Sequence, residues 1–168
     1  MIVIVGVPGA GKSTIGRALS LRLNTPFVDI DDLIVKSVGK PISDIFTQDG
    51  ESVFRDIEAS TIASVLAGPD SVVSLGGGAL GRLETRELVK AHTVVWLNVS
   101  LAAAVDRVGL NRNRPLLLGN VRGRLSELMS EREPIYRDAA NFTIETTGLT
   151  ITQVVDTAVD LLNGAQTS

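Results

Sequence analysis

The chain has 168 residues, of which 44% are hydrophobic and 21% are charged, a balance typical of a soluble globular protein. This length fits a single domain, which we expect to span residues 1–168. The net charge of −3 argues against a nucleic-acid partner or an anionic membrane surface, and no apolar run approaches the roughly 20 residues of a membrane span. The sequence has no cysteine, which excludes disulfides and thiolate zinc sites and fits a reducing cytoplasm, where we expect the protein to act.

Short apolar, β-branched runs alternate along the chain with segments whose apolar residues recur at helical spacing. In chain order we expect a strand at 2–5, a helix at 12–24, a strand at 27–30, a helix at 31–39, a short helix at 42–50 capped by Ser43, a helix at 51–67, strands at 71–75 and 92–99, helices at about 100–108 and 123–131, a strand at 141–146 and a helix at 151–163. Strands buried on both faces and separated by helices are typical of a parallel sheet. We therefore predict a three-layer α/β fold, with a five-stranded parallel sheet and helices on both faces.

Ligands of such folds bind beyond the carboxyl ends of the strands. In this sequence glycines or acids follow three of the expected strands: the glycine-rich stretch 6–11, Asp29 with Asp31, and the three glycines at 76–78. We expect the functional site at these three places.

Residues 6–13, GVPGAGKS, match the pattern G-x-x-x-x-G-K-[ST] and lie between an expected strand and an expected helix, as this phosphate-binding P-loop requires. Its glycines let successive backbone N–H groups point at one anion, and the helix N-terminus adds its dipole. Lys12 would reach the β- and γ-phosphates, Ser13 would give a hydroxyl ligand to Mg²⁺, and Thr14 would lie near the α-phosphate. The stretch predicts a nucleoside triphosphate site made by Gly9, Ala10, Gly11, Lys12, Ser13 and Thr14.

Residues 27–34, FVDIDDLI, place three acids on and just after the strand that follows the P-loop helix. Asp29 could hold Mg²⁺, directly or through a water, and Asp31 could orient an attacking hydroxyl or accept its proton. Alternation along a strand would put these two carboxylates on the same side, and Asp32 is interpreted as an acid of the next helix start. The alternative is that all three acids only start a helix. The chain has no N/T-K-x-D tetrapeptide, so a guanine-specific GTPase is not favoured.

Six segments carry a wider resemblance: GVPGAGKST at 6–14, DID at 29–31, IFTQDGESVFRDIE at 45–58, SLGGGA at 74–79, NRPLL at 113–117 and EREPIY at 131–136. In their order and spacing, over nearly the whole chain, the sequence resembles the shikimate kinase family. The resemblance implies a P-loop kinase fold of the nucleoside-monophosphate-kinase type. It also implies ATP-dependent phosphorylation of the shikimate 3-hydroxyl, with Mg²⁺ as cofactor, in the chorismate route to the aromatic amino acids.

The resemblance further implies roles for single residues. Asp31 would contact the reacting hydroxyl, and Asp29 would lie near Mg²⁺. Arg107 would stack on the adenine, and Arg114 would reach the phosphates from a lid at about 109–123. The shikimate carboxylate and ring would be held by Arg55, Arg132, Gly76, Gly77 and Gly78.

A shikimate-binding segment is expected at about 31–58. A guanidinium in it suits a carboxylate, because the two groups pair through parallel charge-assisted hydrogen bonds. Taken alone, however, Arg55 is more typical of an arginine that extends to solvent along a largely apolar helix, and it is the resemblance that favours the binding role. Phe46 and Phe54 could line the apolar face of the substrate, although as isolated residues they are equally typical of the core.

One segment departs from the family, which often carries an arginine or a proline beside the adenine near the C-terminus. Here residues 146–150 read TTGLT, so we expect mainly backbone contacts to the adenine. Two rival functions remain. A kinase for another hydroxylated metabolite, such as gluconate, would not need the paired Arg55 and Arg132. A non-catalytic ATP-binding regulator would bind without turnover, and the intact P-loop and acids argue against it. We expect a monomer.

Overall fold

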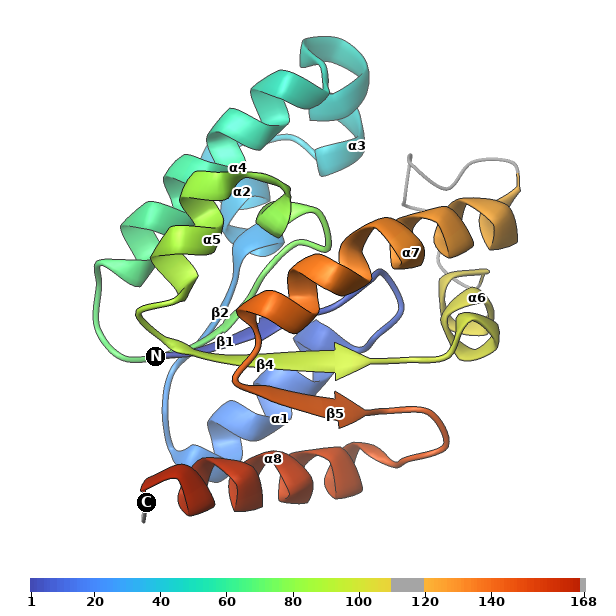
Figure 1. Cartoon of the computed structure of the whole chain (residues 1–168). Coiled ribbons are helices and arrows are strands. Elements are labelled where there is room, and N and C mark those ends of the chain that lie inside the picture. Colours follow the sequence, from blue (N-terminus) through green and yellow to red (C-terminus); the bar gives the residue numbers. More distant parts are fainter. Residues whose placement is uncertain (110–119, 167–168) are drawn as a thin grey trace.

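The computed structural model of the chain describes residues 1–109 and 120–166 (Figure 1). Its centre is a sheet of five strands, β1 (Ile2–Val5), β2 (Phe27–Asp29), β3 (Val72–Ser74), β4 (Thr93–Asn98) and β5 (Phe142–Glu145). The strands lie in the order β2-β3-β1-β4-β5, and every neighbouring pair runs parallel. The predicted five-stranded parallel sheet is therefore confirmed.

Helices connect the strands and cover the sheet. They are α1 (Lys12–Leu23), α2 (Ile30–Val38), α3 (Ile42–Asp44), α4 (Glu51–Leu66), α5 (Leu83–Val89), α6 (Leu101–Gly109), α7 (Val121–Ala139) and α8 (Ile151–Gln166), with a π-helical turn η1 (Ile45–Asp49) and a 3₁₀ turn η2 (Ala79–Gly81). Helices α1 and α8 pack together on one face of the sheet, and α7 crosses the other (Figure 1). This confirms the predicted three layers. Within the described ranges, no helix is long and apolar enough to cross a membrane.

Two expectations around the second strand are wrong. β2 ends at Asp29, and Ile30 already begins α2, because the Asp29 carboxylate accepts hydrogen bonds from two N–H groups of the first helical turn and so caps the helix. Ser43 is not a helix cap, since α3 begins after Pro41 and includes Ser43. Gly39 does end α2, as expected, in the left-handed conformation with φ 77°.

The helices α5 and α7 also differ from expectation. α5 is a short helix that the sequence pattern did not predict. α7 was expected to stop at about residue 131, but it continues through Pro134 to Ala139. A proline removes one helical hydrogen bond and normally bends or ends a helix. Here Leu125 and Tyr136 are buried on either side of the proline, so packing holds the helix together.

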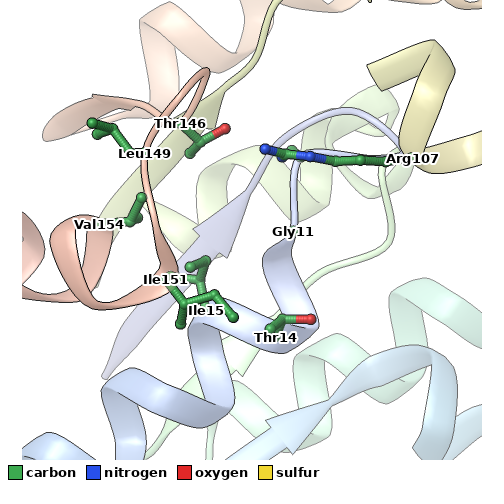
Figure 2. A pocket seen from close by; sticks show the side chains of 9 residues that line it. Gly11, Thr14, Ile15, Arg107, Thr146, Leu149, Ile151 and Val154 are labelled. Carbon is green, nitrogen blue, oxygen red and sulfur yellow. The ribbon is translucent and has the colours of Figure 1, made fainter. Parts of the chain in front are cut away.

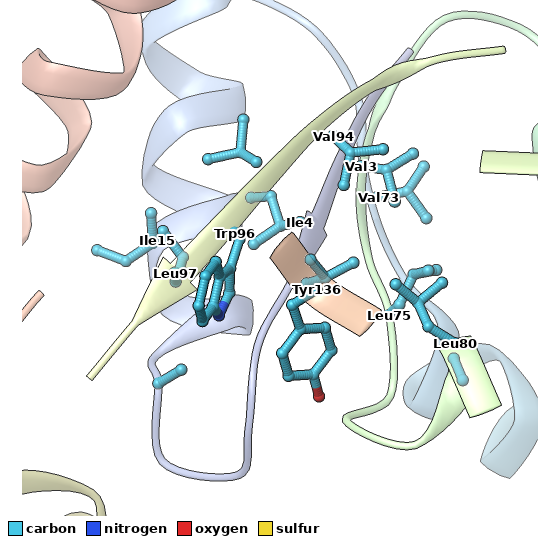
Figure 3. Close-up of a cluster of buried hydrophobic side chains, with 14 of the residues drawn as sticks. Val3, Ile4, Ile15, Val73, Leu75, Leu80, Val94, Trp96, Leu97 and Tyr136 are labelled. Carbon is cyan, nitrogen blue, oxygen red and sulfur yellow. The ribbon is translucent and has the colours of Figure 1, made fainter. Parts of the chain in front are cut away.

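The hydrophobic core lies around the three central strands (Figure 3). Val3 of β1, Val73 of β3 and Val94 of β4 are fully buried, and each such side chain stabilises the fold by about 1.5–3 kcal/mol. Trp96 of β4 and Tyr136 of α7 lie side by side in this core, and their ring centroids are 5.9 Å apart.

The strand order determines where the site forms. β3 lies between β1 and β2, and its Ser74 is in register with Ile4 on one side and with Asp29 on the other. Because the carboxyl ends of parallel strands meet at one edge, the glycines after β3 lie between the P-loop after β1 and the acids after β2. The three places singled out in the sequence therefore come together.

Candidate active site

The P-loop is held in shape by its glycines. Gly9 and Gly11 have φ values of 85° and 92°, a left-handed conformation that residues with a side chain rarely adopt. A Cβ atom at Gly6 would lie 2.6 Å from a carbonyl oxygen of β4. Lys12 begins α1, is 8% exposed, and donates from Nζ to the Val7 carbonyl oxygen at 3.2 Å. The loop thus gathers an ammonium group and a helix N-terminus at one place, which suits a phosphate.

A pocket of about 250 Å³ adjoins the P-loop (Figure 2). It is lined by Ala10, Gly11, Thr14, Ile15, Arg107, Thr146, Leu149, Ile151 and Val154. Arg107 of α6 reaches the loop, where its Nη1 donates to the Gly9 carbonyl oxygen at 3.2 Å. Arg107 and the P-loop residues that were expected around the nucleotide therefore lie together.

The wall of this pocket opposite Arg107 is apolar. It is formed by Leu149, Ile151 and Val154 (Figure 2). Thr146 is also in the wall, but its Oγ1 donates to the Asn98 carbonyl oxygen at 3.0 Å. Mainly backbone contacts to the adenine were predicted here. The apolar residues around the start of α8 were the signal that could have indicated a side-chain wall.

The acids after β2 start a helix. Asp29 Oδ1 accepts from the N–H groups of Asp31 at 3.0 Å and of Asp32 at 3.4 Å. Asp31 lies in the first turn of α2, so Asp29 and Asp31 do not alternate along one strand as predicted, and the helix-start alternative describes the backbone. Asp31 nevertheless faces the site, since its Oδ1 would lie 3.2 Å from a Cβ atom at Gly76. Asp32 is exposed, and its Oδ2 lies 3.9 Å from Arg17 Nη2.

Ser13 and Asp29 are the expected Mg²⁺ ligands, and their chemistry fits this ion. Ser13 is exposed in the first turn of α1, and the second carboxylate oxygen of Asp29 is not used by the helix cap. In residues 1–109 and 120–166, no three His, Cys, Asp or Glu side chains gather as a metal cluster. Mg²⁺ at phosphoryl-transfer sites usually takes one or two protein oxygens together with phosphates and water. The donor set therefore suits Mg²⁺ carried by a nucleotide.

The glycine triplet at 76–78 connects the two halves of the site. A Cβ atom at Gly77 would lie 3.1 Å from Pro8 Cδ and 3.3 Å from the Gly6 carbonyl oxygen, so this residue touches the P-loop. The same atom would also lie 3.3 Å from Arg132 Nη1. Gly77 therefore joins the P-loop to one of the two arginines expected to hold a carboxylate.

The two flanking glycines, Gly76 and Gly78, lie next to Asp31 and Arg55, which were also predicted to be site residues. A Cβ atom at Gly76 would overlap the Glu58 carboxylate and lie close to Asp31. At Gly78 it would lie 2.7 Å from Arg55 Cζ, which is closer than any ordinary contact. The Glu58 carboxylate and the Arg55 guanidinium thus occupy the space that a side chain at these two positions would need.

Arg55 is held between two acids of α4. Its Nη1 lies 2.6 Å from Glu58 Oε2, and its Nη2 lies 3.3 Å from Glu51 Oε1. Glu58 is 2% exposed, and this burial raises the pKa of its carboxyl, while the charge and hydrogen bond of Arg55 oppose the rise and the charge of Asp31 adds to it. Glu58 was not among the residues predicted from the sequence. Its signal was an acid three residues after Arg55, at a spacing that places the two side chains on the same face of the helix.

The two expected aromatic residues take different positions. Phe54 is 3% exposed and belongs to the core, whereas Phe46 is only half-buried. Their ring centroids are 4.7 Å apart, and Arg55 Cζ lies 5.9 Å from the Phe46 centroid. Phe46 lies in the π-helical turn η1, and such turns are frequent at functional sites.

Arg114 and the central part of the expected lid, residues 110–119, lie outside the described residues. The two ends of the expected lid are described. Helix α6 ends at Gly109, and the Asn120 side chain caps α7 by accepting a hydrogen bond from the Gly123 N–H at 2.9 Å.

Known proteins resemble the chain over nearly its full length. The family model for shikimate kinase matches residues 8–163. Shikimate kinase of Thermobifida fusca is 49% identical over 146 residues, which are 87% of this chain and 85% of that protein. Shikimate kinase of Rhodococcus erythropolis is 45% identical over 161 residues, 95% of each chain. The structure of shikimate kinase from Acinetobacter baumannii in complex with shikimate superposes with a TM-score of 0.96 at 32% identity, over 99% of this chain and 94% of that one. The chain belongs to the shikimate kinase family.

Proposed function

We propose that this chain transfers the γ-phosphoryl group of ATP to the 3-hydroxyl of shikimate where the P-loop meets the glycine triplet. The observation that carries the proposal is the position of Gly77, between Pro8 of the P-loop and Arg132. A small hydroxylated carboxylate held on the Arg132 side would have its hydroxyl groups next to the terminal phosphate. Phosphoryl transfer requires mainly such positioning, together with neutralisation of charge.

ATP would bind with its phosphates in the P-loop and its adenine in the adjoining apolar pocket. The backbone N–H groups of residues 9–14 and the Lys12 ammonium would hold the phosphates. Arg107 would lie against the base, opposite the apolar wall. Arg114, outside the described residues, is proposed to reach the transferring phosphate.

Shikimate would bind on the side of Asp31. Guanidinium groups pair with a carboxylate through parallel hydrogen bonds, so Arg55 and Arg132 would hold its carboxylate. Glu58 keeps the Arg55 guanidinium in place, and Phe46 would cover the apolar face of the ring. Asp31 would orient the attacking hydroxyl and receive its proton.

Ser13 and Asp29 would hold Mg²⁺, Ser13 through its hydroxyl and Asp29 directly or through a water. When bound, the ion supplies neutralisation of the charge on the β- and γ-phosphates. Because the cap of α2 also depends on Asp29, this side chain would link the metal to the helix that carries Asp31.

We also propose that the chain works as one domain and as a monomer in the cytoplasm. Every proposed site residue comes from one chain, so no second copy is needed to complete the site. The absence of cysteine and the use of ATP both suit the cytoplasm.

Release of ADP from MgATP tests the proposed function. Added shikimate is expected to raise the rate to about 1–100 s⁻¹, the usual range for kinases. Gluconate and nucleoside monophosphates should leave it at the rate with ATP alone, and chelation of Mg²⁺ should abolish it. Turnover with another alcohol but not with shikimate would contradict the acceptor. Binding of ATP without turnover on any acceptor would favour the regulator.

The closeness of the Arg55 guanidinium to Gly78 allows a sharper test of the proposed shikimate site. In Gly78→Ala the new Cβ must displace the Arg55 guanidinium, and a shift of about 1 Å at such a group can lower kcat/KM for shikimate by about 10- to 100-fold. The KM for ATP should stay within about twofold, because Arg55 lies on the shikimate side. Steady-state kinetics with each substrate varied in turn would measure both effects.

Gly81→Ala is the matched control. Gly81 lies in the same 3₁₀ turn region, and a Cβ atom there would meet nothing within 4 Å. Its kinetics should match those of the unchanged protein. If both variants lost activity equally, displacement of Arg55 would not be the cause.

A further inference from the structure

Tyr136 of α7 is hydrogen-bonded to the glycine triplet. Its hydroxyl donates to the Gly77 carbonyl oxygen at 2.5 Å, across 59 residues of sequence. The ring is 2% exposed and packs beside Trp96 at the edge of the apolar cluster (Figure 3). The activity described above does not require this residue to touch either substrate.

The same helix carries Arg132 one turn before Tyr136, so the two side chains lie on one face. Gly77 is therefore contacted twice by α7. The Tyr136 hydroxyl donates a hydrogen bond to the Gly77 carbonyl oxygen. Arg132 Nη1 lies beside the same residue, 3.3 Å from the position that a Cβ atom of residue 77 would take. The P-loop, through Pro8, lies against the same residue.

The Tyr136 phenol is protonated at neutral pH and can act as a donor. Burial raises the pKa of Tyr136 to about 12 and the charge of Glu58 adds to the rise, although the charge and hydrogen bond of Arg132 and the charge of Arg55 act in the opposite direction. The hydroxyl therefore keeps its proton for the Gly77 carbonyl oxygen at neutral pH, and the bond does not depend on titration. A donor that is always available can fix the distance between a helix and a loop.

We propose that Tyr136 is a positioning residue for shikimate binding. Its hydroxyl holds Gly77 against α7 and so determines where Arg132 lies relative to Asp31 and Arg55 on the other side of the triplet. The proposal rests on the proposed function of Arg132 as a ligand of the shikimate carboxylate. It assigns Tyr136 no contact with the substrate.

Tyr136→Phe removes the hydroxyl and keeps the ring. The KM for shikimate is expected to rise by about three- to tenfold, the effect of one lost hydrogen bond, while the KM for ATP stays within about twofold. Trp96→Phe is the control for packing, because it reduces the ring contact but keeps the hydroxyl bond. Trp96→Phe should lower Tm without changing the ratio of the two KM values. If Tyr136→Phe lowered Tm alone, with both KM values unchanged, the role would be structural and the proposal overturned.

A double-mutant cycle with Arg132→Ala separates this proposal from the one on which it rests. If Tyr136 acts through Arg132, the double variant should have the same KM for shikimate as Arg132→Ala alone. Effects that multiply would overturn the proposal. A raised KM in Arg132→Ala with a normal KM in Tyr136→Phe would overturn the role of Tyr136 only. A raised KM in Tyr136→Phe with a normal KM in Arg132→Ala would instead contradict the proposed function of Arg132, and positioning through Arg132 with it.

Discussion

Asp31→Asn is expected to lower kcat for shikimate phosphorylation by about 10²- to 10⁴-fold, the usual contribution of a group that transfers a proton. Asparagine has the size of aspartate but cannot accept the proton of the attacking hydroxyl. Asp31 faces Gly76, and the Asp29 cap fixes its place in the first turn of α2. The KM values for shikimate and ATP should change by less than about threefold, because the site keeps its shape. Single-turnover measurements of phosphoryl transfer would check the chemical step directly.

Asp32→Asn is the matched control for this change. Asp32 lies in the same helical turn, and its N–H also donates to the Asp29 cap, but its side chain is exposed. Both variants lose one negative charge near a helix N-terminus and so lose the same small stabilising interaction with the helix dipole. Only Asp31→Asn should lose turnover. A kcat within about twofold of normal would remove Asp31 from the mechanism.

The sheet and the P-loop could be predicted because their signals are local. A β-branched run such as residues 2–5 is typical of a buried strand, and the glycines that follow it set the backbone within a few residues. The end of α7 could not be predicted in this way. Pro134 normally ends a helix, and the sequence does not show that Leu125 and Tyr136 anchor the helix on both sides of it.

The candidate site could be predicted in its residue types but not in its contacts. Asp31 was singled out for its chemistry, yet the geometry assumed for it was that of a strand, whereas Asp29 caps a helix. Glu58 was missed because an acid on a helix usually faces solvent, and its burial depends on the end of β3 lying beside α4. Tyr136 was missed because its partner, Gly77, is far away in sequence. Such contacts follow from the strand order, which the periodicity of single segments does not determine.

Arg55→Ala is expected to raise the KM for shikimate by about 10- to 100-fold, the effect of losing charge-assisted hydrogen bonds to a carboxylate. The KM for ATP should change little, because Arg55 lies at Gly78 and not at the P-loop. Arg55→Lys should give an intermediate KM, since lysine keeps the charge but lacks the planar pair of donors. Kinetics with each substrate varied at saturation of the other would measure this, and an equal rise of both KM values would contradict the role.

The loss of Arg55 also leaves Glu58 without its counter-ion, so an effect on stability must be separated from the effect on binding. Burial raises the pKa of Glu58 above its ordinary value of 4.5 and Arg55 opposes the rise, so Arg55→Ala should raise this pKa further. Between 4.5 and the raised value the folded state binds more protons than the unfolded state, so the stability of Arg55→Ala should fall as pH rises through this range. In Arg55→Ala/Glu58→Gln this pH-dependent loss should disappear, because glutamine does not titrate, while the KM for shikimate should stay raised. A KM that returned to normal in the double variant would assign the effect to the unpaired Glu58 carboxylate and not to the missing guanidinium.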